Sequence, residues 1–375
     1  MRVFLQAIYG QVFLGAYIMR RGYQALPPRK AGRVIFFAFF VVEWLLYFMG
    51  FFFYKDLSDP VLHFIMLICN TWYIASFYLT LGLIALDLVR LSNRIRAWYP
   101  NIIKRHWNCT KMLLFVVFVL SVTGLMIRGY HNAIHPAVRQ IHIHIDKEMG
   151  GRDSLTIVMM SDWHIGEFVR KQHVQRFVEL ANAEHPDLIV IAGDILDYEV
   201  RQAEKQHIEE DLQQLKAPLG VYMVLGNHEY RANRFAKISW LEKTGATLLI
   251  DSVVMPDSTF YLIGRDDLVN SGRASMETLL TGVDKSKPVI VVEHQPVHVN
   301  DLIDHQCDLG LYGHTHNGQY WPFSLLLKWV FEFPYGYFSK GSSHIYVSSG
   351  IGFAGQPYRV GTRSEMVYIS MNNEQ

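Results

Sequence analysis

The chain has 375 residues, half of them hydrophobic and only 18% charged, and its mean hydropathy is positive. An average soluble protein carries roughly 25% charged residues, so this composition excludes a disordered or collagen-like chain and disfavours a wholly soluble one. Residues 1–130 hold 14 Lys/Arg and 4 Asp/Glu, a net charge of +10, whereas the remainder stands at −9. Because nucleic-acid binding needs a basic face, we expect no nucleic acid among the partners.

Four apolar runs predict an α-helical transmembrane domain over residues 1–130, with spans at 3–19, 34–54, 61–89 and 112–127. The second run has 21 residues, and as a helix it matches the roughly 30 Å of a bilayer's hydrocarbon core. The first run contains Gln6 and Gln11. A cleaved signal peptide is the alternative for this run, and it fits poorly because Arg20 and Arg21 follow.

The loops between these spans predict the orientation of the chain. Residues 20–33 hold five Lys/Arg and residues 90–111 hold six, whereas the turn at 55–60 holds one. The positive-inside rule places the two basic loops in the cytoplasm. We therefore expect a multi-pass protein of the bacterial inner (cytoplasmic) membrane, with the chain after the last span on the periplasmic side.

Two acids, Glu43 and Asp87, fall within or near the predicted spans. Acids at membrane depth often mark functional sites. The alternatives are a helix–helix hydrogen bond for Glu43 and an interfacial position for Asp87. Of the three cysteines only Cys307 lies in the acidic part, so no disulfide forms within that part.

From about residue 138, short β-rich runs alternate with helical periodicity, which predicts an α/β domain over residues 131–375. The predicted helices cover 169–184 and 201–216. The predicted strands are at 155–160, 188–192, 221–225, 260–263, 289–292, 309–312, 344–347 and 366–369.

Metal-type side chains follow five of these strands, and carboxyl ends of strands in an open sheet converge on one crevice. Oxygen and imidazole ligands without a thiolate suit two borderline divalent cations rather than a structural zinc. A separate pair, His142 and His144 with Asp146, is interpreted as the exposed face of a strand. The five blocks are Asp162-Trp163-His164, Gly193-Asp194, Gly226-Asn227-His228-Glu229, Glu293-His294 and Gly313-His314-Thr315-His316.

In this order, the five blocks resemble the calcineurin-like metallophosphoesterase superfamily over roughly residues 138–375. The stretches 161–166, 313–319 and 346–350 resemble its membrane-associated bacterial YkuE/YaeI-like branch. The resemblance implies a two-sheet sandwich flanked by helices. Glu229 stands where the family more often has Asp, and Asn317 where Gly is usual.

The resemblance also implies a role for each site residue. Two divalent cations about 3.5–4 Å apart would clamp a phosphoryl group and activate a bridging hydroxide; manganese is expected, and zinc, iron, cobalt or nickel are alternatives. His228 would protonate the leaving group or stabilise charge, oriented by Glu229. The first cation would be bound by Asp162, His164 and His316, the second by Asn227, His294 and His314, and both by Asp194.

Two further residues have weaker assignments. Asp197 follows the Gly-Asp block and is expected either in the site or only as a support of its loop. Arg359, in the C-terminal tail, is a candidate substrate-binding residue that would pair with phosphate. A surface ion pair is the alternative for Arg359.

The segment Tyr320–Phe338 is unusual because nine of its 19 residues are aromatic. Trp and Tyr at this density are typical of a membrane interface. The alternative is a packed loop that covers the sheet. The segment begins four residues after His316, so the first interpretation would make lipid and the metal ions neighbours.

Together these features predict a membrane-bound phosphoesterase that hydrolyses a phosphorylated lipid or lipid-linked headgroup. One alternative is a phosphoesterase of soluble periplasmic substrates that uses its spans only as an anchor. Others are a pyrophosphate hydrolase of nucleotide-linked lipids, and an inactive domain linked to sensing or transport.

Overall fold

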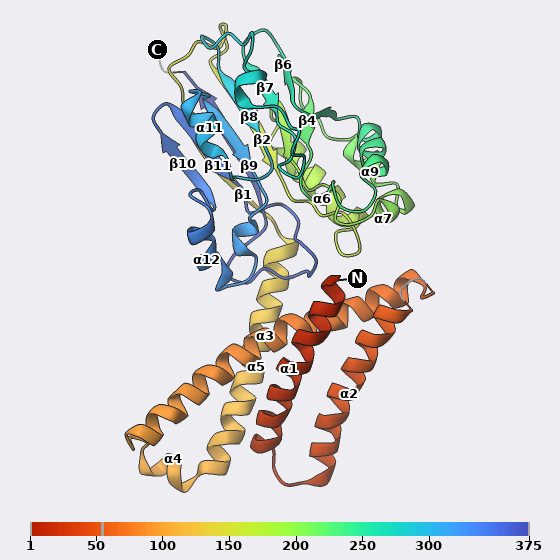
Figure 1. Cartoon of the computed structure of the whole chain (residues 1–375), viewed down its shortest axis with the longest axis vertical. Helices are drawn as coiled ribbons and strands as arrows, with labels where there is room; N and C mark the ends of the chain where they lie inside the picture. The colour runs from red at the N-terminus through yellow and green to blue at the C-terminus, as the bar shows by residue number, and fades with distance from the viewer. Residues whose placement is uncertain (1, 54–55, 374–375) are drawn as a thin grey trace. The chain divides into compact units, whose positions relative to one another are not determined.

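The computed structural model describes residues 2–53 and 56–373 and divides into two compact units, Met1–Arg128 and Gly129–Gln375 (Figure 1). The described residues of the first unit form helices joined by short loops. Its helices are α1 (Arg2–Ala25), α2 (Lys30–Phe52), α3 (Asp59–Ile95), α4 (Asn101–Arg105) and α5 (Trp107–Ile134), the last turns of α5 belonging to the second unit.

Three helices of the described residues are long and apolar enough to cross a membrane, at Lys30–Gly50, Asp59–Ile95 and Trp107–Ile134. The remaining predicted span, 3–19, is helical within α1, which is not among these candidates, so three of the four predicted spans are supported. The predicted end of the second span, Tyr54, lies outside the described residues.

Polar side chains join α1 to α3. Gln11 Nε2 donates a hydrogen bond to Ser76 Oγ (3.0 Å), and Asp87 accepts from Tyr17 (2.8 Å) while it pairs with Arg21 and Arg90. The helix–helix hydrogen bond considered for Glu43 is not found. Its carboxylate is buried, and neither oxygen has a hydrogen-bond partner among the described residues.

The second unit is a sandwich of two six-stranded mixed sheets. The first sheet has the order β1 (Ala137–His144), β12 (Glu365–Asn372), β2 (Ser154–Met160), β3 (Leu188–Ala192), β4 (Val221–Val224) and β5 (Thr247–Leu249). The second has the order β10 (Gly336–Lys340), β11 (Ser343–Val347), β9 (Leu309–Tyr312), β8 (Val289–Val292), β7 (Tyr261–Gly264) and β6 (Ser252–Val254).

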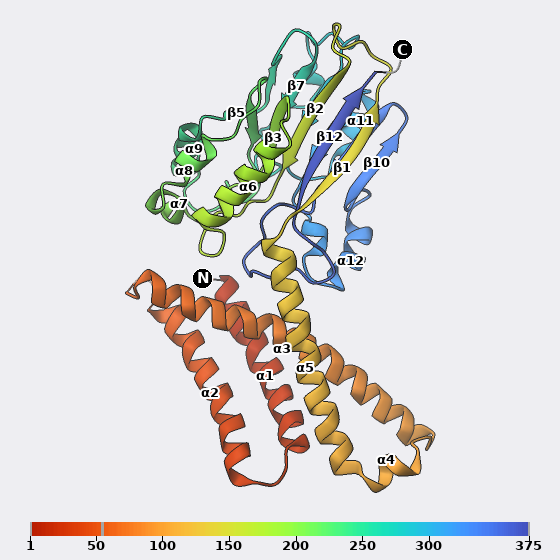
Figure 2. The same ribbon diagram turned by 180° about the vertical axis from the view of Figure 1, so that it is seen from behind.

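Helices cover the outer faces of both sheets, as Figure 2 shows from behind. The first sheet carries α6 (Lys171–Ala183), α7 (Arg201–Lys205), α8 (Ile208–Leu212) and α9 (Arg234–Leu241). The second carries α10 (Met276–Leu279) and α11 (Val299–Asp304), and α12 (Phe323–Val330) follows a short 3-10 turn, η2 (His316–Gly318).

Alternate side chains of the central strands enter different cores, because successive residues of a strand point to opposite faces. Ile157 of β2 packs between the sheets with Ile290 and Ile369, whereas Val158 packs outward against the helices with Phe177. Burial on both faces explains why these strands appear in the sequence as continuous apolar runs.

All eight predicted strands are present within one to three residues of their expected ends. The predicted helix 201–216 is instead two short helices, α7 and α8, because His207 adopts a left-handed conformation between them. His142 and His144 are exposed on β1 while Ile143 is buried, as expected. The short strands β5, β6 and β10 were not predicted.

The inter-sheet core predicts a large cost for a cavity at β12. Ile369→Ala removes a fully buried side chain between the sheets, and such truncations cost about 2–5 kcal/mol. We expect a clear fall in the thermal midpoint of the second unit, followed by near-ultraviolet circular dichroism. The half-exposed Val297→Ala is the control and should leave the midpoint nearly unchanged. Equal midpoints for the two variants would contradict the packing described above.

Candidate metal centre

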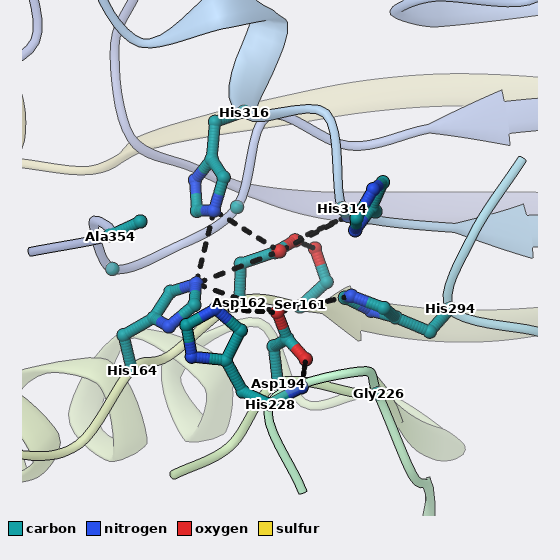
Figure 3. A network of polar contacts seen from close by, with 12 residues as sticks. Ser161, Asp162, His164, Asp194, Gly226, His228, His294, His314, His316 and Ala354 are labelled. Atoms are coloured by element: carbon teal, nitrogen blue, oxygen red, sulfur yellow. Dashed lines mark hydrogen bonds and ion pairs between the residues drawn. The ribbon is translucent and has the colours of Figure 1, made fainter. Parts of the chain in front are cut away.

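The predicted metal-type side chains follow five strands whose carboxyl ends meet at one edge of the sandwich. β2, β3 and β4 are parallel neighbours in the first sheet, as are β8 and β9 in the second. Figure 3 shows the side chains pointing toward one another from the loops after these strands. They are Asp162, His164, Asp194, His228, His294, His314 and His316.

The backbone of this site is held in an unusual conformation. Asp162, His164 and Asp194 each have φ of 52°, and His314 and His316 have φ of 73° and 49°. Residues other than glycine seldom adopt these left-handed values, and they cluster at functional sites where the surrounding fold enforces them. The sandwich therefore fixes these side chains in place at a conformational cost.

Glycines make room for the close approach of the loops. A Cβ on Gly226 would collide with the carboxylate of Asp194, and one on Gly313 would lie 2.5 Å from Asp162 Oδ2. Gly193 has φ of 78°, and a Cβ there would lie 2.7 Å from His294 Nδ1. Each glycine precedes a predicted ligand. The glycines therefore allow the turn and also leave room for the ligand side chain of a neighbouring loop.

Three side chains form a first ligand group. His164 Nε2 and His316 Nε2 lie 3.0 Å apart, and Asp162 Oδ1 is 3.4 Å from His316 Nε2 and 3.9 Å from His164 Nε2. All three side chains are buried. One oxygen and two imidazole nitrogens therefore surround one point, as a divalent cation of the transition series prefers.

A second ligand group shares its carboxylate with the first. Asp194 Oδ2 lies 3.2 Å from His294 Nε2, and His314 completes the group. Asn227 Oδ1, 2.9 Å from His314 Nδ1, adds an oxygen. The same Asp194 Oδ2 is 3.8 Å from His164 Nε2. Asp194 is therefore the carboxylate within reach of both groups.

The protonation of His294 tests whether the site fits a cation. His294 Nδ1 lies 2.8 Å from the carbonyl oxygen of Ala192 and must donate to it, so Nε2 presents a lone pair to Asp194. Two acceptors facing each other at 3.2 Å need a positive charge between them. Burial lowers the pKa of His294, but the Asp194 carboxylate outweighs burial and raises this pKa to about 10. Without a metal ion, a second proton on the ring therefore supplies the positive charge. A divalent cation would replace this proton, so the residues fit a metal ion.

The other histidines are suited to bind as neutral imidazoles. Burial, with the nearby charge of His294, lowers the pKa of His314 to about 3. Burial also holds the pKa of His316 well below its usual range. A neutral imidazole keeps the lone pair that a metal ion needs.

His228 lies beside both groups, and Asp197 orients it. His228 Nδ1 donates to the carbonyl oxygen of Asp197 (2.7 Å) and lies 3.1 Å from its carboxylate Oδ1. These contacts turn His228 Nε2 toward the site, 3.9 Å from Asp194 Oδ2. Asp197 Oδ1 is also 3.5 Å from His164 Nδ1. Despite burial, these two histidines lower the pKa of Asp197, which therefore remains ionised.

The prediction that Glu229 orients His228 is wrong. The buried Glu229 carboxylate accepts hydrogen bonds from the backbone N–H groups of Asp194 (3.0 Å), Leu196 (2.9 Å) and Gly226 (2.8 Å). None of these hydrogen bonds involves the His228 ring. Glu229 therefore stabilises the backbone that carries the shared ligand.

Both predictions for Arg359 need correction. Arg359 is fully buried, so it makes no surface ion pair. Its guanidinium donates to the carbonyl oxygens of Ser349 (2.5 Å), Gly352 (2.7 Å) and His316 (3.3 Å), which leaves little capacity for a phosphate. Arg359 instead supports the loop of the ligand His316 from behind.

Sequence reasoning missed the acids that follow β7. Asp266 and Asp267 are fully buried; Asp266 accepts from Tyr230 (2.5 Å), and Asp267 accepts from Gln295 (2.9 and 3.0 Å) next to His294. They join the loops after β4, β7 and β8. The available signal in the sequence was the pair Asp266 and Asp267 shortly after a predicted strand. This pair has no neighbouring histidine and matches none of the five blocks.

Comparison with known proteins identifies the family. A family model described as calcineurin-like phosphoesterase matches residues 155–318. An uncharacterized metallophosphoesterase of Helicobacter pylori is 32% identical over 268 residues, covering 70% of this chain and 71% of the relative. YkuE of Bacillus subtilis, also an uncharacterized metallophosphoesterase, is 26% identical and covers 65% of this chain and 90% of its own length.

A further relative extends over both units. A Danio rerio protein named transmembrane protein with metallophosphoesterase domain is 29% identical, covering 96% of this chain and 86% of the relative. With the three apolar helices, this relative indicates membrane association. Relatives thus occur in vertebrates as well as bacteria. The chain belongs to the calcineurin-like metallophosphoesterases, metal-dependent phosphoester hydrolases that use a dinuclear divalent metal site.

Proposed function

We propose that this protein is a membrane-anchored phosphoesterase that hydrolyses a phosphorylated lipid or lipid-linked headgroup. The observation that carries the proposal is the carboxylate of Asp194 shared between two ligand groups, in a chain with three candidate spans. The first group would hold one cation through Asp162, His164 and His316, and the second group another through Asn227, His294 and His314. Manganese is the cation we expect first.

The residues of this chain position the reaction around that pair. When bound, two divalent cations would polarise the phosphoryl oxygens and lower the pKa of a water molecule between them. His228 directs Nε2 toward the site while Asp197 holds Nδ1. From this position Nε2 can pass a proton to the oxygen that leaves phosphorus, which is general acid catalysis.

The orientation in the membrane follows from the loop charges. The basic loops at 20–33 and 90–111 favour the cytoplasm, which would place the second unit on the extracytoplasmic side of a bacterial inner membrane. A lipid substrate on that side would be met by an enzyme tethered to the same bilayer. The relative named transmembrane protein with metallophosphoesterase domain, which matches over both units, supports the tether to a membrane.

The substrate class is tested directly with full-length protein. Detergent-purified enzyme should hydrolyse a generic aryl phosphodiester, and it should act faster on phospholipid headgroups in mixed micelles than on soluble phosphoesters of equal concentration. Faster turnover of the soluble compounds would instead favour an enzyme whose helices serve only as an anchor.

Asp194→Asn should abolish turnover and remove or scramble both cations, because a neutral amide replaces the one carboxylate that serves both groups. Activity and metal content per chain, the latter by inductively coupled plasma mass spectrometry, check this expectation. The matched control is Asp146→Asn, an exposed acid remote from the ligand groups. Near-normal activity with two cations still bound would refute the assignment of Asp194.

His228→Ala should lower kcat by roughly 10²–10⁴, the usual contribution of general acid–base catalysis, while the metal content stays near two per chain. Asp197→Asn should lower kcat less, since it removes the carboxylate beside His228 Nδ1 but keeps the backbone carbonyl that accepts from it. Glu229→Gln should act differently and lower metal content, because it weakens the backbone hydrogen bonds under Asp194. If His228→Ala loses its metal, His228 is a ligand and not the acid.

A protease added to intact spheroplasts of a bacterial expression host should digest residues 131–375, because the proposed orientation puts them outside. Immunoblots with a tag at the C-terminus follow the digestion. A cytoplasmic marker protein should stay intact in the same sample. Digestion of residues 131–375 only after lysis would reverse the proposed orientation.

A further inference from the structure

α12 is an apolar helix whose side chains all remain outside the core. None of its residues is buried. Leu325, Leu326, Trp329 and Val330 are 52%, 44%, 85% and 73% exposed, and we call these four residues the α12 apolar surface. Leaving so much apolar area in water is unfavourable, so such surfaces usually mark an interaction site.

The rest of the aromatic segment behaves differently. Phe333 is buried in the core outside the second sheet, and Phe338 packs against it. Tyr335 donates a hydrogen bond to the buried Glu365 (2.8 Å). The packed-loop interpretation therefore fits Phe333, Tyr335 and Phe338, whereas the preceding helix has no such core.

α12 is attached at both ends to the loop that carries His314 and His316. At the beginning of α12, the backbone of Ser324 lies so close to Gly318 that a Cβ on Gly318 would be 2.5 Å from the Ser324 nitrogen. At its end, Thr315 Oγ1 donates to the carbonyl oxygen of Pro334 (2.8 Å), and the Phe331 ring lies 6.2 Å from the His314 ring. The position of α12 is thus fixed relative to the ligand groups.

The same region is attached to the end of the last candidate span. Trp321 N–H donates to the carbonyl oxygen of Val360 (2.7 Å), and Arg359 N–H donates to that of Gly129 (2.8 Å). Ser364 N–H donates to the carbonyl oxygen of Asn132 (3.1 Å). Gly129 and Asn132 lie in the last turns of α5, within the second unit, and Figure 2 shows α12 at the end of this unit where α5 joins it.

A helix that crosses a bilayer emerges at the membrane surface, and residues bonded to its last turns lie near that surface. We infer that the α12 apolar surface inserts into the lipid interface of the membrane that α5 crosses. The inference rests on the proposed function in taking α5 as a membrane span. Trp329 and the leucines occupy the boundary between headgroups and acyl chains, and the exposed Lys328 extends its ammonium toward lipid phosphates.

Insertion of α12 would favour lipid phosphoesters as the substrate class. The helix is attached to the His314–His316 loop, so its insertion holds the ligand groups near the depth of lipid phosphoryl groups. A phosphoester at the headgroup level then reaches the site without leaving the bilayer. A soluble phosphoester gains nothing from the same contact.

Spin labelling tests the insertion independently of activity. Cys109 is the exposed free cysteine and is replaced by serine, whereas Cys69 and Cys307 are buried. A nitroxide is then attached to Trp329→Cys in full-length protein reconstituted into vesicles of phosphatidylcholine and phosphatidylglycerol. Collisions with molecular oxygen should exceed those with a water-soluble nickel chelate at position 329.

The matched control is a nitroxide at Phe235→Cys on α9, where the native side chain is 83% exposed but lies on the first sheet's side of the unit. Collisions with the nickel chelate should dominate there. The inference is overturned if position 329 behaves like position 235, because α12 then faces water. It is also overturned if both reagents are excluded at position 329, because protein, such as a second copy of the chain, then covers the helix.

Activity separates this inference from the proposed function. Trp329→Ser combined with Val330→Ser should lower hydrolysis of a vesicle-embedded phospholipid by roughly tenfold or more, with Phe235→Ser as the control. Hydrolysis of a soluble aryl phosphodiester and the metal content should be unchanged. Equal losses on both substrates would show that α12 only supports the fold. If wild-type protein cleaves no lipid but the label at position 329 lies in the bilayer, the proposed substrate fails while the insertion stands.

Discussion

His294 and Asp194 hold two hydrogen-bond acceptors against each other in a buried site, and only a positive charge between them makes that arrangement favourable. The carbonyl oxygen of Ala192 fixes this arrangement, because it accepts the proton on His294 Nδ1 and leaves Nε2 to face Asp194. Much of the surrounding structure serves to maintain this contact. Gly193 has no side chain where one would strike His294, and Glu229 anchors the backbone of Asp194.

Such a site is unfavourable by itself, so the fold that surrounds it must supply the free energy that holds it together. The ligand residues adopt left-handed backbone conformations, and several are ionisable groups that are buried. Three hydrophobic cores offset these costs: one between the two six-stranded sheets and one on the outer face of each sheet. The carboxyl ends of their parallel strands present the loops from both sheets to one another, and this is why the ligands come from segments far apart in the sequence.

The sequence predicts the central strands well because burial on both faces leaves runs of apolar residues, such as Leu188–Ala192. The edge strands β5 and β6 have three residues each and are partly exposed, so no comparable run marks them. The polar contacts that join α1 to α3, from Gln11 to Ser76 and from Tyr17 to Asp87, likewise leave no local pattern that predicts the pairing.

The ligand blocks were predictable because each follows a strand, whereas the direction of a side chain within a turn was not. Glu229 adjoins His228 in the sequence, yet Asp197 from another loop contacts the His228 ring. Arg359 was expected to face phosphate or solvent, yet it lies behind His316 among backbone carbonyl groups. Both errors concern contacts between segments, which depend on the relative position of loops rather than on local pattern.

The order of strands in the first sheet has a consequence for biosynthesis. β1 and β2 are consecutive in the chain, but β12, the last strand, lies between them and pairs with both. The sheet therefore closes only after residues 365–372 have left the ribosome, long after the apolar helices have been synthesised. Until then the edges of β1 and β2 that pair with β12 are open, and open strand edges are prone to pair with other chains.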